Sequence, residues 1–179
     1  MPVSICFLDD YQGLVERMAP LDRLADAEWR SVRTHIEPEA LPAELAGVDV
    51  VVAMRERTRF DRPMFERLPD LKLLCTTGPR NAAIDLQAAA DHGVTVSACE
   101  GRATGNTAEL AWGLALSVLR HIPAEAARVH DGGWQETVGT DLMGATLGLL
   151  GLGNIGTRMA RIAQAFEMDV VAWSQNLTP

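Results

Sequence analysis

The sequence carries little positive charge. Its 16 lysine and arginine residues stand against 24 aspartate and glutamate residues, which leaves a formal net charge of −8. A protein that binds nucleic-acid phosphates needs a basic face, so this balance argues against a nucleic-acid partner. A pocket for a small anion is still compatible with an acidic total, because such a pocket needs only local donors.

Long apolar runs are also lacking. No segment approaches the ~20 consecutive apolar residues that a membrane-spanning helix needs, and no basic stretch leads into an apolar one at the N-terminus. We therefore expect no membrane partner and no secretory signal.

Cysteine is scarce, and its spacing is uninformative for metal or disulfide chemistry. The three thiols, Cys6, Cys75 and Cys99, form an odd set without a C-x-x-C pair. Each lies in or beside an apolar, strand-like run, which favours small buried thiols in a reducing cytosol. The sequence thus predicts a soluble cytoplasmic protein without a metal site.

Short apolar runs alternate with stretches of helical spacing over the first hundred residues. A weaker fifth run covers residues 28–35, and the four clear ones cover 3–8, 49–54, 71–77 and 93–98. Runs that are apolar without alternating polar residues are typical of strands buried on both faces of a parallel sheet. The pattern predicts an α/β fold with right-handed crossovers.

The pattern changes near residues 100–104, where we expect a domain boundary. Residues 104–122 predict one long apolar helix, for which Thr104 or Asn106 is the candidate cap. Pro123 either ends this helix or opens another over residues 123–131, which two glycines then stop.

A glycine-rich turn follows an apolar strand pattern in the last third of the chain. The stretch GLGNIG supplies G-x-G-x-x-G at Gly151, Gly153 and Gly156, with Asn154 and Ile155 between them. The first glycine permits a tight turn, the second lets backbone approach a pyrophosphate, and the third lets the following helix pack closely. A helix pattern and a second strand come next, as a dinucleotide-binding unit requires. The sequence therefore predicts a cofactor-binding turn at these five residues.

The end of the second strand is unusual for such a unit. A carboxylate normally stands there and accepts hydrogen bonds from the adenosine ribose of NAD. Ser174 occupies or adjoins this position, Asp169 precedes the strand, and no arginine is present that would favour a 2′-phosphate. The cofactor is therefore NAD or NADP, with Ser174 among its expected contacts and the choice left open.

Several motifs, taken in order, resemble the D-isomer-specific 2-hydroxyacid dehydrogenase family. Residues 71–101 resemble its substrate-domain loop, its I-D-x-x-A-A helix and its G-I-x-V strand. Residues 106–120 resemble the V-A-E helix that links its two domains, and residues 141–173 resemble its L-x-G-x-T-x-G-I-I-G-L-G-x-I-G block. The match is clear from about residue 50 to residue 173.

The resemblance implies two domains with the substrate between them. Residues 1–102 would form a flavodoxin-like substrate (catalytic) domain that lacks its C-terminal elements. Residues 103–179 would form the linking helix and the first part of a Rossmann NAD(P)-binding domain, where Thr107 either approaches the nicotinamide or caps the helix. The implied reaction is NAD(P)-dependent reduction of a 2-keto acid to a D-2-hydroxy acid, or the reverse, in a homodimer.

The same resemblance assigns the substrate carboxylate to the loop of Gly78, Pro79 and Arg80, where converging backbone amides would bind it. The loop departs from the family's G-x-G-x-D pattern, because Arg80 takes the second glycine position and Ala82 replaces the aspartate. Arg80 either adds a guanidinium fork to this site or is a surface arginine. Arg55 either lies near the substrate cleft or belongs to a solvated basic run.

The family's chemistry uses an arginine, a general-acid histidine and a carboxylate, all downstream of the glycine turn. The histidines of this chain, His35, His92, His121 and His130, all precede that turn. We therefore expect the N-terminal part of a longer enzyme, with no catalytic residue among the 179 and no turnover by this chain alone. A non-catalytic nucleotide sensor or corepressor-like protein of the same fold is the alternative. A formate-dehydrogenase-like or phosphoglycerate-dehydrogenase-like enzyme is a third possibility.

Overall fold

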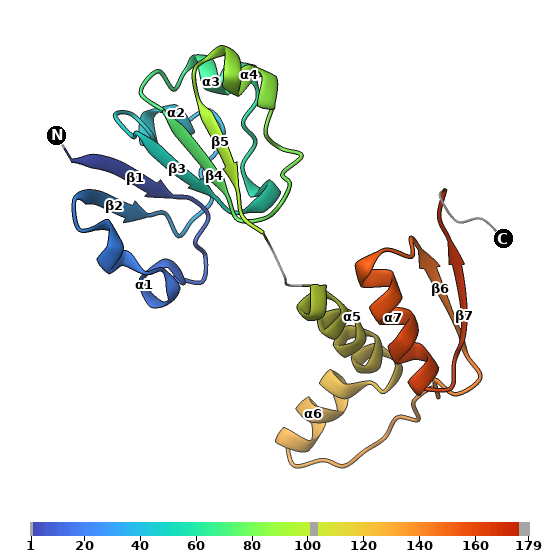
Figure 1. Cartoon of the computed structure of the whole chain (residues 1–179). Helices are drawn as coiled ribbons and strands as arrows, with labels where there is room; N and C mark the ends of the chain where they lie inside the picture. The colour runs from blue at the N-terminus through green and yellow to red at the C-terminus, as the bar shows by residue number, and fades with distance from the viewer. Residues whose placement is uncertain (1, 101–103, 176–179) are drawn as a thin grey trace. The chain divides into compact units, whose positions relative to one another are not determined.

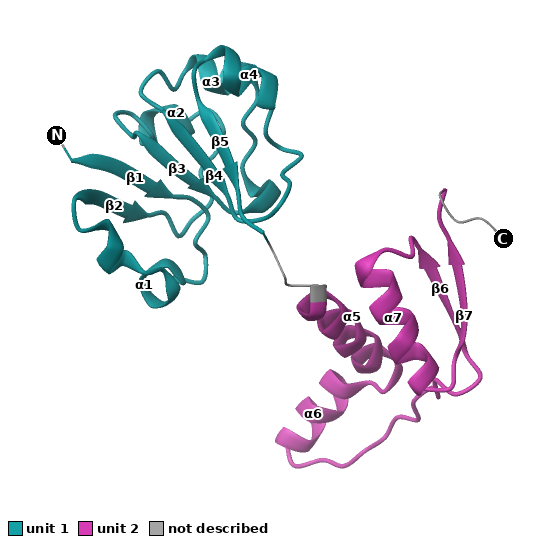
Figure 2. Ribbon diagram, in the orientation of Figure 1, with its two compact units in different colours: residues 1–101 teal, residues 102–179 magenta. Residues whose placement is uncertain are grey.

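The chain divides into two compact units, residues 1–101 and residues 102–179 (Figure 2). The computed structural model describes residues 2–100 and 104–175. The boundary expected between residues 102 and 103 lies outside the described residues.

The first unit is built on a parallel sheet of five strands (Figure 1). Its order is β2-β1-β3-β4-β5, and every neighbouring pair is parallel. This is the doubly wound order of flavodoxin-like folds, as predicted. The weak run at residues 28–35 contributes an edge strand, which explains its less apolar pattern. The strands are β1 (Val3–Phe7), β2 (Ala27–Ser31), β3 (Val50–Ala53), β4 (Leu73–Thr76) and β5 (Thr95–Ala98).

Short helices connect these strands. The two predicted at residues 61–69 and 82–92 begin at Asp61 and Asp85, whose carboxylates accept from the amides of Met64 and Ala88. Such N-caps satisfy donors that the first helical turn leaves unpaired. The helices are α1 (Val15–Met18), η1 (Leu21–Leu24), α2 (Leu41–Glu44), η2 (Arg55–Arg57), α3 (Arg62–Glu66) and α4 (Leu86–Asp91).

The core of the first unit lies between the sheet and these helices. Val51 and Leu74 on the central strands are fully buried, and Phe60, Phe65 and Leu41 cover them from the connections. Burial of central strands on both faces accounts for the continuous apolar runs in the sequence.

The three thiols differ in exposure. Cys6 is buried, and burial raises its pKa to about 11. Burial likewise raises the pKa of the half-buried Cys75. Cys99 is exposed, so the expectation of a buried thiol is wrong at this position. Its amide donates to the carbonyls of Thr76 and Gly78 just after β5 ends, so the main chain is anchored there while the side chain faces solvent.

The second unit contains three helices and two strands among its described residues. A break at His121, where φ is +54°, separates the first two helices, and Pro123 opens the second of them. Asn106 lies inside the first helix and is not its cap, contrary to one of the two predictions. The side chain of the other candidate, Thr104, lies outside the described residues. The elements are α5 (Thr104–Leu119), α6 (Ile122–His130), β6 (Thr146–Leu150), α7 (Asn154–Ala165) and β7 (Asp169–Trp173).

Packing in this unit is one-sided. Helix α5 contacts α7 through Trp112 and Phe166, whose ring centroids lie 5.1 Å apart. Helix α7 also contacts the parallel strands β6 and β7. The face of these strands that points away from α7 carries three exposed apolar side chains: Leu150, Val171 and Trp173 are 91%, 57% and 67% exposed. In the parts of the chain that the structure describes, no helix has the length and apolar character needed to cross a membrane.

Candidate functional site

The glycine turn joins the end of β6 to the start of α7. Gly151 adopts φ +102°, a backbone region that favours glycine. Its N–H donates to the carbonyl of Trp173 at 2.7 Å, so the turn is bonded to the last residue of β7. The turn and the end of β7 therefore share the carboxyl edge of the two strands, where nucleotides bind in such sheets.

The other two glycines serve different purposes. A Cβ on Gly156 would lie 2.2 Å from the carbonyl oxygen of Gly151, so this position holds the helix tightly against the turn. A Cβ on Gly153 would meet no other heavy atom of the described chain within 4 Å. Space is thus left open above Gly153, at the point where the sequence predicted a close approach by a ligand.

The start of α7 provides donors for an anion. Gly153 is its N-cap residue, and among the described residues no side chain caps the helix. Asn154 and Ile155, both exposed, begin the first turn, and the first helical hydrogen bond runs from the Thr157 amide to the Gly153 carbonyl. First-turn amides and the helix dipole together favour a phosphate. This arrangement fits the pyrophosphate of a dinucleotide.

Two further residues predicted to contact the cofactor belong to the same unit. Ser174 directly follows β7 and is half-buried beside the glycine turn. Thr107 is exposed and lies inside the first turn of α5, so the alternative that it caps this helix is wrong. Contact of either residue with a nucleotide stays a prediction.

In the first unit, the structure brings two predicted substrate residues together. Arg55 follows β3 with φ +55°, and its guanidinium lies over Gly78, where a Cβ would come within 2.8 Å of Nη1. Asn81, which the sequence reasoning missed, donates from its side-chain amide to the Arg55 carbonyl and to Thr76 Oγ1. Arg80 is exposed in the same loop. The site therefore combines the ends of β3 and β4.

The loop amides are less available than the resemblance implies. The Gly78 N–H donates to the Thr76 carbonyl at 2.9 Å. Pro79 has no N–H to offer. Of the three loop positions, only Arg80 keeps an N–H that has no acceptor among the described residues. Carboxylate binding at this loop would thus depend on that amide and on the guanidinium groups of Arg80 and Arg55, or on a rearrangement of Gly78.

A buried polar network at the end of β1 was also missed. Asp9 has φ +59° and is 2% exposed, and its carboxylate accepts from Thr58 Oγ1 at 2.7 Å and Tyr11 Oη at 2.8 Å. Arg57 donates to the Asp9 carbonyl and lies 4.6 Å above the Tyr11 ring. The network links β1 to the segment that carries Arg55. The polar residues directly after the first buried strand were the available signal, because strand ends form sites in parallel sheets.

Asp10, the next residue, is a buried carboxylate with a structural role. It accepts from the amides of Leu14 and Val15 at 2.7 and 3.2 Å, and from Ser31 Oγ at 2.8 Å. Burial by itself would raise the pKa of Asp10, but these hydrogen bonds outweigh burial and hold its pKa below the ordinary value. The ionised form is therefore stabilised by folding.

We expect Asp10→Asn to destabilise the first unit in a pH-dependent manner. An amide presents a donor where three donors already converge, so the loss at neutral pH should be about 2 kcal/mol. Folding lowers the pKa of Asp10. The contribution of its carboxylate to the free energy of unfolding is therefore complete above the pKa of the unfolded state, about 4, and is lost as the pH falls through the pKa of the folded state. Urea unfolding at neutral pH and at about pH 3 tests this. The exposed Asp22→Asn is the control, and an equal loss at both pH values would contradict the prediction.

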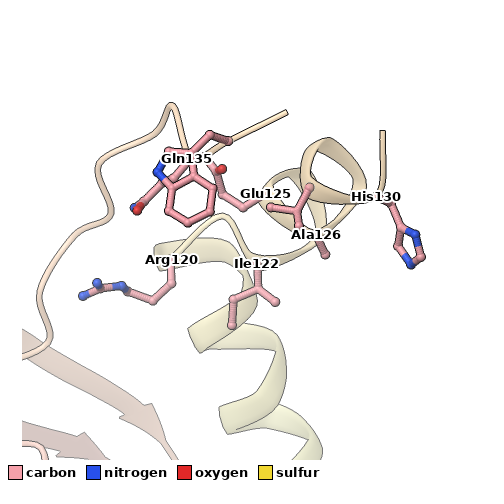
Figure 3. A pocket seen from close by; sticks show the side chains of 8 residues that line it. Arg120, Ile122, Glu125, Ala126, His130 and Gln135 are labelled. Atoms are coloured by element: carbon pink, nitrogen blue, oxygen red, sulfur yellow. The ribbon is translucent and has the colours of Figure 1, made fainter. Parts of the chain in front are cut away.

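A separate hollow of about 770 Å³ lies on the second unit, away from the glycine turn in sequence (Figure 3). Ile122, Glu125 and Ala126 of α6 line it, together with Trp134 from the segment that follows. Glu125 accepts from the amide and hydroxyl of Thr137, which ties that segment to the helix. Ile122 and Trp134 are 49% and 80% exposed, so this is an open apolar surface.

Comparisons with known proteins agree on one family. The family model for the NAD binding domain of D-isomer specific 2-hydroxyacid dehydrogenases matches residues 112–179. A hydroxypyruvate reductase of Thermotoga maritima is 36% identical over 162 residues, which cover 86% of this chain and 53% of that protein. A D-3-phosphoglycerate dehydrogenase of Methanocaldococcus jannaschii is 33% identical over 144 residues, or 79% of this chain and 27% of that protein.

A solved structure gives the same result. The crystal structure of phosphoglycerate oxidoreductase from Vibrio cholerae o395 matches with a TM-score of 0.90 and 32% identity, over 97% of this chain and 56% of that chain. This chain thus spans about half the length of the Vibrio oxidoreductase and of the Thermotoga reductase, at 56% and 53%.

Proposed function

Since this chain belongs to the D-isomer-specific 2-hydroxyacid dehydrogenase family, we propose that it is part of an NAD(P)-dependent oxidoreductase acting on small 2-hydroxy or 2-keto acids. The observation that carries the proposal is the glycine turn. Gly156 packs against Gly151, and among the described residues none fills the space beside Gly153 and no side chain caps the start of α7. These features suit a pyrophosphate.

Within this proposal, residues 1–102 act as the substrate domain, and residues 103–179 supply the linking helix and the cofactor domain. A bound nicotinamide would supply or accept the hydride. Arg55 and Arg80 would attract and orient the substrate carboxylate, because guanidinium groups pair well with carboxylates. The Asp9 network would hold the segment of Arg55 in place. The named activities of the relatives support a small acid as the substrate class.

The test is to separate cofactor binding from turnover. We expect the 179-residue chain to bind NAD(H) and to reduce no 2-keto acid above background. Hydride transfer to a keto acid leaves an alkoxide, which needs a proton donor with a near-neutral pKa, and no histidine follows the glycine turn in these 179 residues. Calorimetric titration measures binding, and the absorbance of NADH measures turnover with glyoxylate and hydroxypyruvate. Robust NADH oxidation by a homogeneous sample would contradict this expectation, and absence of binding would contradict the cofactor site.

The non-catalytic sensor is less well supported, because the curated relatives quoted above are named as a reductase and a dehydrogenase. The homodimer implied by the resemblance belongs to the proposal, and the apolar hollow on α6 is a surface that a second copy could cover. A cytoplasmic location likewise stays a prediction.

A further inference from the structure

The position of Ser174 relative to the glycine turn bears on cofactor choice. Leu150 pairs with Trp173 as the last pair of the β6–β7 ladder, and the Gly151 amide donates to the Trp173 carbonyl at 2.7 Å. Ser174 is the next residue and is half-buried. It therefore stands at the carboxyl edge of β7, where the adenosine ribose lies when a pyrophosphate occupies the turn.

The neighbouring acidic residues cannot replace the usual carboxylate. Asp169 begins β7, and its amide donates to the Ala145 carbonyl at the opposite edge of the sheet. Asp169 comes four positions before Trp173, which corresponds to about 13 Å along the strand. Glu167 comes still earlier in the chain and accepts from the Gly144 amide through its own carbonyl. Both carboxylates thus lie at the wrong end of β7.

A serine changes what the ribose site rejects. A carboxylate accepts from the 2′-hydroxyl of NAD and repels the 2′-phosphate of NADP. The Ser174 hydroxyl can accept from a hydroxyl or donate to a phosphate oxygen, and it carries no charge. Residues 174–179 contain no arginine or lysine, so nothing in that segment favours the phosphate strongly either.

Resting on the proposed cofactor site, we propose that the second unit binds NADP(H) about as tightly as NAD(H), and that Ser174 is the residue that permits this. The neutral serine removes the repulsion on which NAD selectivity depends. The family model that matches this region is named for NAD binding. This chain is therefore a member whose ribose site departs from the NAD-selective pattern.

The experiment is calorimetric titration of NADH and NADPH into the 179-residue chain and into Ser174→Asp. The wild-type dissociation constants of NADH and NADPH should agree within about threefold. Ser174→Asp should lower the affinity for NADPH by about 30-fold and leave the affinity for NADH unchanged or higher. Ser174→Ala removes the hydroxyl without adding charge and should lower the affinity for both nucleotides by a similar factor. Gln164→Glu, an added charge at an exposed position on α7, should leave the ratio unchanged.

The outcomes separate this inference from the proposed function. A wild-type preference for NADH above about tenfold, or a Ser174→Asp variant with unaltered NADPH affinity, would overturn the inference while the cofactor site stands. Failure of the wild type to bind either nucleotide would overturn the cofactor site and the inference with it.

Discussion

Gly156→Ala should unfold much of the second unit. The added Cβ would lie 2.2 Å from the Gly151 carbonyl oxygen, a backbone atom that cannot move without distorting the turn. The Gly151 amide is itself bonded to Trp173, so distortion would spread to β7. Overpacking against backbone costs about 3 kcal/mol. A small unit with one open sheet face has little stability to lose.

The measurement is thermal or urea unfolding followed by far-UV circular dichroism, with limited proteolysis to locate the affected unit. Gly148→Ala is the matched control, because its Cβ would meet no described atom within 4 Å and its φ is not positive. An unchanged unfolding midpoint for Gly156→Ala would contradict the close packing of α7 against the turn.

Gly153→Val should have the opposite profile, with the fold retained and cofactor binding nearly abolished. The backbone of Gly153, at φ −81° and ψ −158°, is extended and suits a β-branched residue. The valine side chain would enter the open space that the pyrophosphate needs. We expect affinity for NAD(H) and NADP(H) to fall about 100-fold or more, since the phosphate could no longer approach the first-turn amides.

Calorimetry of the folded variant decides this prediction. Gly148→Ala again serves as control, because it changes a glycine on β6 without entering the turn. Unaltered affinity in a folded Gly153→Val protein would overturn the assignment of the glycine turn as a cofactor site. The two variants together separate packing, which depends on Gly156, from ligand access, which depends on Gly153.

Local features of the molecule could be predicted well from the sequence. The apolar runs that became β1, β3 and β4 are visible because these strands lie inside the sheet, where burial leaves little polar alternation. The run that became β5 belongs to an edge strand whose residues are mostly exposed, so burial on both faces does not explain it. The glycine turn could be predicted because its three glycines lie within six consecutive residues, although its hydrogen bond to the distant Trp173 could not. The family assignment is confirmed by the matching family model and relatives.

Features that depend on distant contacts were harder to predict. Asp9 and Thr58 are 49 positions apart, and their hydrogen bond exists only because β1 and β3 are adjacent in the sheet. Arg55 and Gly78 were both predicted to belong to the substrate site, but the position of the Arg55 guanidinium over Gly78 was not predicted. Cys99 was misjudged because the residue after a strand can face solvent even when the strand pattern is apolar.

The exposed apolar face of β6 and β7 leaves the second unit without part of the folding free energy that burial of this face would supply. Burying side chains such as Leu150, Val171 and Trp173 is worth roughly 1.5–3 kcal/mol each, which is comparable to the whole folding free energy of a small domain. A polypeptide that covered this face would add stability to the unit that holds the cofactor turn. Folding of the turn and occupancy of the face would then be linked equilibria, and covering the face would also raise the apparent affinity of the turn for its nucleotide.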